Sequence, residues 1–133
     1  MAPSYVRKSD AVVIVYDVTD SSSFIDVPTY WLPFVRKYLY PGRNDVSMLL
    51  LGNKIDKLGM RTITAEDGSS IARDEGMQFC EVSARNSISV SKVFHCLSQT
   101  LVSKENEELD KLSQLTTTLR RNQIELDTNN ITP

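Results

Sequence analysis

Residues Leu49–Gly59 read LLLGNKIDKLG. An unbroken apolar run stops at Gly52. An amide, an ammonium and a carboxylate follow at once: Asn53, Lys54 and Asp56. A continuous apolar run is typical of a strand buried on both faces of a parallel sheet, and ligands lie beyond the carboxyl ends of such strands. The stretch therefore predicts a strand over 46–51 that ends at Gly52 and carries polar side chains to a ligand site.

Two further apolar segments have the same character, residues 11–18 (AVVIVYDV) and 77–82 (MQFCEV). Between the strands, Thr64 is a candidate helix N-cap with Asp67 as its capping-box partner, and Gly76 ends the helix. After the third strand, apolar residues recur at helical spacing: Val90, Phe94, Leu97 and Leu101. Strands that alternate with helices at this spacing predict an α/β fold with a parallel sheet and right-handed crossovers.

The segment between the first two strands has a less regular helical pattern. It begins with cap-type residues (TDSSSF), and Phe24, Val27 and Trp31 follow at helical spacing. Pro28 and Pro33 interrupt the pattern, because an interior proline costs about 3 kcal/mol in a helix. We expect Pro28 to open the main helix and Pro33 to kink it.

Composition excludes several classes of protein. With 133 residues the chain fits one domain, and a net charge of −2 provides no basic field for nucleic acid. No apolar run approaches the roughly 20 residues that span a bilayer, and the first residues lack the core of a signal peptide. A cytoplasmic protein is therefore expected. Cys80 and Cys96 lack CxxC spacing and are expected to be reduced.

From residue 104 onward the composition changes. Residues 104–133 are polar, with leucines spaced by three or four: Leu109, Leu112, Leu115 and Leu119. We expect a C-terminal arm that is partly helical, too short for a clear coiled coil, and disordered after Asp127.

The strand-end residues suit guanine. Asp56 offers two adjacent acceptor oxygens to the N1–H and exocyclic amine of guanine, whereas adenine would present an acceptor that the carboxylate repels. The stem of Lys54 would lie along the base, and Asn53 would brace neighbouring loops. The backbone N–H of Ala84, in the segment VSAR, would meet the guanine carbonyl.

Simpler roles stay open for the polar residues. Asn53 and Asp56 could only cap their loop, and SARNS could be a turn. Asp17 and Asp20 fit loop and helix caps better than ligands, and His95 fits a structural or surface role.

These motifs resemble a known family. NKID, residues 53–56, resembles the N-K-x-D motif of Ras-superfamily GTPases, and EVSARN resembles their S-A-K motif, with Arg85 in place of the usual lysine. PSYVRKSDAVVIVYDVTDSSSF resembles the Rab branch, and the likeness runs from about Pro3 to Leu101. The resemblance implies a partial P-loop NTPase fold of the Ras-like type in residues 1–103, with GTP or GDP as ligand. It implies a base site formed by Asn53, Lys54, Asp56, Ser83, Ala84 and Arg85.

Other family motifs do not occur in the sequence. None of the five glycines is followed by lysine, so the phosphate-binding loop G-x-x-x-x-G-K-[ST] is missing. DKLG at 56–59 matches the switch II pattern D-x-x-G only by coincidence, since it follows the base motif. We therefore expect a truncated domain that lacks the N-terminal strands, the phosphate loop, the catalytic residues and the Mg²⁺ ligands of the complete family domain. No cysteine stands near the C-terminus, so no prenyl anchor is expected either.

Two functions are consistent with these features. The resemblance implies a Rab-type switch in vesicle traffic, with guanine nucleotide and Rab effectors or regulators as partners, and with endomembrane association only in a complete prenylated form. Two buried charge-assisted hydrogen bonds contribute about 3–6 kcal/mol, whereas association costs about 4–15 kcal/mol. We therefore expect weak base binding and no measurable hydrolysis.

The alternative is a nucleotide-independent interaction module derived from a Rab-like protein. An unrelated flavodoxin-like protein would not explain NKID and SAR at successive strand ends.

Overall fold

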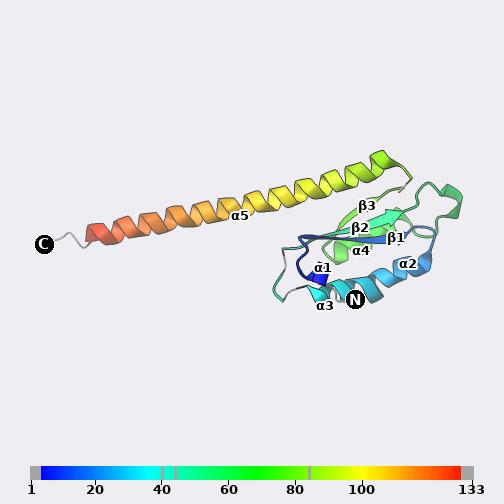
Figure 1. Cartoon of the computed structure of the whole chain (residues 1–133), viewed down its shortest axis with the longest axis horizontal. Coiled ribbons are helices and arrows are strands. Elements are labelled where there is room, and N and C mark those ends of the chain that lie inside the picture. The colour runs from blue at the N-terminus through cyan, green and yellow to red at the C-terminus, as the bar shows by residue number, and fades with distance from the viewer. Residues whose placement is uncertain (1–3, 40, 44, 84, 130–133) are drawn as a thin grey trace. The chain divides into compact units, whose positions relative to one another are not determined.

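The computed structural model describes residues 4–39, 41–43, 45–83 and 85–129. The chain divides into two units, residues 1–98 and 99–133. In chain order the elements are α1 (Ser4–Arg7), β1 (Ala11–Asp17), α2 (Ser21–Asp26), the π-helical turn η1 (Val27–Trp31), α3 (Leu32–Tyr38), β2 (Ser47–Asn53), the 3-10 turn η2 (Leu58–Met60), α4 (Ala65–Asp74), β3 (Gln78–Glu81) and α5 (Ser87–Asn129) (Figure 1).

The three strands form one parallel sheet in the order β1-β2-β3. Asp17 pairs with Asn53 at the carboxyl ends of β1 and β2, and Gly52 pairs with Glu81 on β3. Because the strands are parallel, their carboxyl ends meet at one edge of the sheet. The predicted α/β class with a parallel sheet is confirmed.

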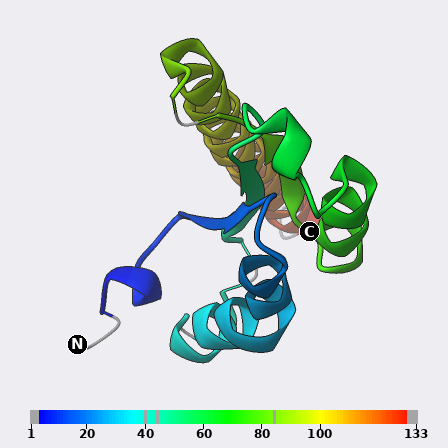
Figure 2. The same cartoon turned by 90° about the vertical axis from the view of Figure 1, so that its right-hand side faces the viewer.

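Helices cover both faces of the sheet (Figure 2). On one face, Ile14, Tyr16 and Val18 pack with residues of the α2–α3 segment and of α4. On the other face, Leu49 and Val82 pack against Val93 in the first turns of α5. The apolar run of β2 has no polar face because both of its sides are covered, whereas β1 is not buried on both sides as predicted, since Val15 is 50% exposed.

Gly52 lies inside β2, so the prediction that the strand ends there is wrong. A Cβ at this position would lie 2.8 Å from the Tyr16 hydroxyl oxygen, so the glycine permits close approach of that ring. The chain turns instead at Lys54, whose φ is 68°. The Lys57 N–H donates to the Lys54 carbonyl at 3.0 Å and closes the turn.

The two prolines produce a π turn where a kink was expected. The Leu32 N–H donates to the Val27 carbonyl, five residues earlier, and Pro33 follows directly at the start of α3. A proline ring clashes with the carbonyl four residues before it in an α-helix, and the wider π turn relieves this clash. Because of the extra residue, Val27 and Leu32 are the buried side chains of this segment. Trp31, which belongs to the expected apolar stripe, is instead 42% exposed.

The helix boundaries around α4 are as predicted. The Asp67 N–H donates to Thr64 Oγ1 at 3.1 Å, and the Thr64 N–H donates to Asp67 Oδ2 at 3.2 Å, which completes the capping box. Gly76 has a φ of 69°, a left-handed conformation that favours glycine after a helix.

Helix α5 begins after Asn86, whose Oδ1 accepts from the backbone N–H groups of Ile88 and Ser89 at 3.1 and 3.2 Å. It runs through the boundary between the units to Asn129. A polar arm over 104–133 with a disordered end stays a prediction, and residues 130–133 lie outside the described part. None of the helices in the described residues is long and apolar enough to cross a membrane.

Candidate functional site

A cavity of about 290 Å³ opens where β2 and β3 end. Five side chains line it: Asn53, Lys54, Asp56, Lys57 and Arg85. Four of them were expected from the sequence, and Lys57 was not, although it stands next to the motif. Ala84, also expected, lies outside the described residues. The fold therefore brings the NKID motif (residues 53–56) and Arg85, from the segment that follows β3, to one cavity.

Ser83 connects the two loops. Its Oγ donates to Asp56 Oδ1 at 2.8 Å and accepts from the Arg85 N–H at 3.3 Å, while the side chain is buried. The hydroxyl of Ser83 is the main cause of a lowered pKa at Asp56, so the exposed carboxyl stays ionised. Each carboxylate oxygen carries two lone pairs, so Asp56 keeps acceptor capacity for a ligand with two adjacent donors.

Asp17 holds the ammonium of Lys54 across the sheet. The two groups form an ion pair with Nζ 2.7 Å from Oδ2, and the N–H and Oγ1 of Thr19 donate to Asp17 Oδ1 at 2.9 and 2.7 Å. The ion pair with Lys54 is the main cause that lowers the pKa of Asp17 to about 2, and it raises the pKa of Lys54. The left-handed backbone of Lys54 costs roughly 1–3 kcal/mol, and this ion pair offsets part of that cost.

Sequence reasoning assigned Asp17 only a cap role. The contact between Asp17 and Lys54 follows from the parallel register of β1 and β2. Asp17 lies opposite Asn53 and therefore one residue from Lys54. Asp20 has its expected role, since its Oδ1 accepts from the Ser22 N–H at the start of α2.

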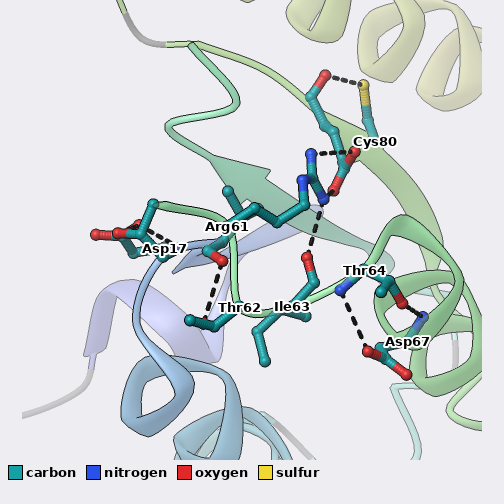
Figure 3. Close-up of polar contacts among 10 residues, drawn as sticks. Asp17, Arg61, Thr62, Ile63, Thr64, Asp67 and Cys80 are labelled. Atoms are coloured by element: carbon teal, nitrogen blue, oxygen red, sulfur yellow. Dashed lines mark hydrogen bonds and ion pairs between the residues drawn. The ribbon is translucent and has the colours of Figure 1, made fainter. Parts of the chain in front are cut away.

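Arg61 ties the segment after the loop to the rest of the sheet (Figure 3). Its guanidinium donates to both carboxylate oxygens of Glu81 at 2.7 and 3.1 Å and to the Ile63 carbonyl at 2.9 Å. The backbone N–H groups of Thr62 and Ile63 both donate to the Val18 carbonyl, at 2.9 and 3.0 Å. Glu81 lies two residues before Ser83, so this network fixes the strand end that presents Ser83 to Asp56.

The remaining candidates from the sequence have no place in this site. His95 is exposed on α5, and the half-buried Cys80 thiol donates to the Glu81 carbonyl at 3.7 Å. Within the described ranges, no group of three or more histidine, cysteine, aspartate or glutamate side chains is placed to hold a metal ion.

A parallel sheet with flanking helices, and with NKID and SAR at the ends of adjacent strands, defines a Ras-like α/β fold. The chain belongs to the Ras family, since the family model described as "Ras family" matches residues 1–103. The expected resemblance is confirmed.

Curated relatives point to the Rab branch. The chain is 34% identical over 110 residues to "Ras-related protein Rab-37" of Homo sapiens, a match that covers 83% of this chain and 48% of the relative. It is 34% identical over 98 residues to "Ras-related protein Rab-26" of Homo sapiens, covering 74% of this chain and 37% of the relative. "Ras-related protein Rab5A" of Oryza sativa subsp. japonica is 34% identical over 102 residues, covering 77% and 48%. The chain thus spans about half or less of the length of these relatives.

Proposed function

We propose that this chain carries the guanine-recognising part of a Rab-type GTP-binding switch. The observation that supports the proposal is that Asn53, Lys54, Asp56 and Arg85 line one and the same cavity, with Ser83 hydrogen-bonded to Asp56. In this proposal Asp56 accepts from the two adjacent donors of guanine, and the stem of Lys54 lies along the base.

Asp17 acts in the proposal as a positioning residue. It fixes the ammonium of Lys54 at 2.7 Å, so the lysine stem has a defined direction before any ligand arrives. Preorganisation of this kind reduces the entropy lost on binding. Ser83 has the same effect on Asp56, because its hydrogen bond restricts the rotation of the carboxylate.

Affinity from these residues alone is expected to be low. The base contacts contribute about 3–6 kcal/mol against an association cost of about 4–15 kcal/mol. The phosphate-loop motif and the Mg²⁺ ligands of the family do not occur in the 133 residues, so the groups described provide base recognition and not hydrolysis. A role in vesicle traffic, Rab effectors or regulators as partners, and a cytoplasmic location with endomembrane association of a prenylated form are part of the same proposal. So is the division into a partial GTPase domain, residues 1–103, and a polar arm.

A nuclear magnetic resonance titration of the full chain with GDP and ADP tests the base site. We expect millimolar GDP, and not ADP, to shift the amide signals of residues 53–57 and 83–85. Asp56→Asn should remove this preference, because an amide places a donor against a donor of guanine. Asp74→Asn, an exposed aspartate on α4, is the matched control and should leave it unchanged. Absence of guanine-specific shifts would refute the proposal, and micromolar affinity would contradict the low affinity expected here.

One observation favours the alternative of an interaction module. Four neighbouring aromatic rings lie on η1 and α3: Tyr30, Trp31, Phe34 and Tyr38. Tyr30 and Trp31 are 53% and 42% exposed. Aromatic residues are enriched at protein interfaces. A folded chain that shows no guanine-specific shifts would favour this second function.

A further inference from the structure

A row of aromatic rings lines an open groove on η1 and α3. The rings of Tyr30 and Phe34 are stacked with an interplanar angle of 19° and centroids 6.0 Å apart, and the centroids of Phe34 and Tyr38 lie 4.9 Å apart. Trp31 stands beside them, with its ring centroid 4.8 Å from that of Tyr30. Contiguous exposed rings of this kind mark an interaction surface. The groove, which we call the aromatic groove, has a volume of about 240 Å³ and is lined by Thr29, Tyr30, Pro33, Phe34, Lys37 and Tyr38.

One cation lies at the Tyr38 end of this groove. Lys37 Nζ is 5.3 Å from the centroid of the Tyr38 ring, whose face attracts the ammonium. Residues 27–39 contain one other charged side chain, Arg36, which is paired with Glu75. Among the described residues, Lys37 forms no salt bridge. The charge of the aromatic groove is therefore complementary to a ligand that carries an anionic group.

The groove presents side chains and not a strand edge. The backbone groups of a helix are bonded along its own axis, so a strand added here would find no ladder of hydrogen bonds. A polyproline II segment needs no such ladder, because its backbone stays solvated and its proline rings pack on aromatic side chains. The fixed backbone of such a segment also loses little entropy on binding. The hydroxyls of Tyr30 and Tyr38 donate to no acceptor within the described part of the chain, so they can donate to its carbonyl groups.

We propose that the aromatic groove binds a proline-rich, acidic segment of a partner protein. The prolines pack on the rings of Tyr30, Phe34 and Tyr38, and a glutamate or aspartate of the segment pairs with Lys37. This inference gives the alternative interaction function a partner of defined chemistry. It does not depend on guanine recognition, because the described residues that line the two cavities are different.

Fluorescence of Trp31 provides the measurement, since Trp31 is the one tryptophan and its ring lies against Tyr30. The probes are decaproline peptides in which glutamate replaces each proline in turn, and a second set with glutamine at the same positions. Titrated into the full chain, the best glutamate peptide should give a saturable change in fluorescence. Its glutamine counterpart should bind about two- to fivefold more weakly, as expected for the loss of an exposed ion pair. Raised salt should remove this difference.

Two variants with matched controls locate the contact. Lys37→Met keeps the apolar stem and should abolish the preference for glutamate, whereas Lys92→Met, at an exposed lysine on α5, should retain it. Tyr30→Ala should weaken binding of the best peptide by about tenfold. Phe94→Ala removes an exposed ring from α5 and should leave binding unchanged. Circular dichroism reports whether each variant is folded, and if Tyr30→Ala is not, the change at the exposed Lys37 decides.

Four results would overturn the proposal. Neither peptide set changes Trp31 fluorescence at millimolar concentration, or the glutamate and glutamine peptides bind equally well at low salt. Peptide binding that Lys37→Met and Tyr30→Ala leave intact places the contact elsewhere. A blue shift with vesicles of phosphatidylcholine and phosphatidylserine, and none with the peptides, would assign the rings to a membrane surface. A fluorescence change that depends on the concentration of the chain alone would assign them to a second copy.

Discussion

We expect the ion pair between Asp17 and Lys54 to contribute measurably to the stability of the fold. Asp17→Asn removes the charge and keeps the shape of the side chain. The pKa of Asp17 falls from 3.8 to about 2 in the folded chain, which corresponds to at most about 2.5 kcal/mol of stabilisation. The Lys54 side chain is 45% exposed, so solvent screening reduces the expected contribution to about 1 kcal/mol.

The pH dependence follows from the direction of this change. The folded pKa lies below the unfolded value, so the stabilisation is present above about pH 4 and is lost as the pH falls towards 2. Urea unfolding, followed by Trp31 fluorescence, should therefore show that wild type is about 1 kcal/mol more stable than Asp17→Asn at pH 7. The difference should narrow between pH 4 and pH 2. Asp74→Asn, the exposed control, should change stability by less than about 0.5 kcal/mol.

A double-mutant cycle separates the ion pair from other effects of the substitution. Lys54→Met keeps the apolar stem and removes the ammonium. We expect a coupling of about 1 kcal/mol between Asp17→Asn and Lys54→Met. A coupling below about 0.3 kcal/mol, or a stability difference that does not vary between pH 7 and pH 2, would refute the reasoning.

Three further predictions concern the packing around Tyr16 and the start of α4. Gly68→Ala should cost about 2–3 kcal/mol in urea unfolding, because its Cβ would lie 2.6 Å from a Phe79 ring carbon. Gly59→Ala, which meets nothing within 4 Å, should cost less than about 0.5 kcal/mol, and equal costs would contradict the steric argument. Tyr16→Phe should be neutral or stabilise by up to about 1 kcal/mol, since the buried hydroxyl has no hydrogen-bond partner within the described residues. Burial raises the pKa of Tyr16 to about 12, so wild type should lose more stability than Tyr16→Phe in a pH titration from 10 to 12. Thr64→Ala should lower thermal stability by an amount equivalent to about 1 kcal/mol, whereas Thr64→Ser should retain most of the cap; equal losses would contradict capping.

The strands and the α4 cap were predictable because their signals are local. Buried parallel strands require apolar side chains on both faces, and a capping box needs only Thr64 and Asp67 at the correct spacing. The end of β2 was not predictable in this way. Gly52 usually signals a turn, but here it makes room for the ring of Tyr16, which comes from another strand.

The sequence predicts those residues of the candidate site whose position follows from the order and direction of the strands. Asn53, Lys54, Asp56 and Arg85 line one cavity because parallel strands end at the same edge. The supporting residues were missed because their partners are distant in the sequence. Arg61 meets Glu81 across 20 residues, and a single sequence gives no sign of such pairs.

The π turn determines which side chains of η1 and α3 face the core and which, like Trp31, are exposed. A π turn contains one more residue than the α turn it replaces, so η1 is equivalent to a single-residue insertion absorbed inside a helix. Every side chain after it is rotated by about 100° from where an uninterrupted helix would place it. Removal of one residue from η1 would leave an ordinary α turn in which Leu32 follows Val27 by four residues and keeps its place in the core. An α turn without that deletion would bring Trp31 into the same place. The exposure of Trp31 therefore depends on the π hydrogen bond between Leu32 and Val27, which places Leu32 and not Trp31 in the core.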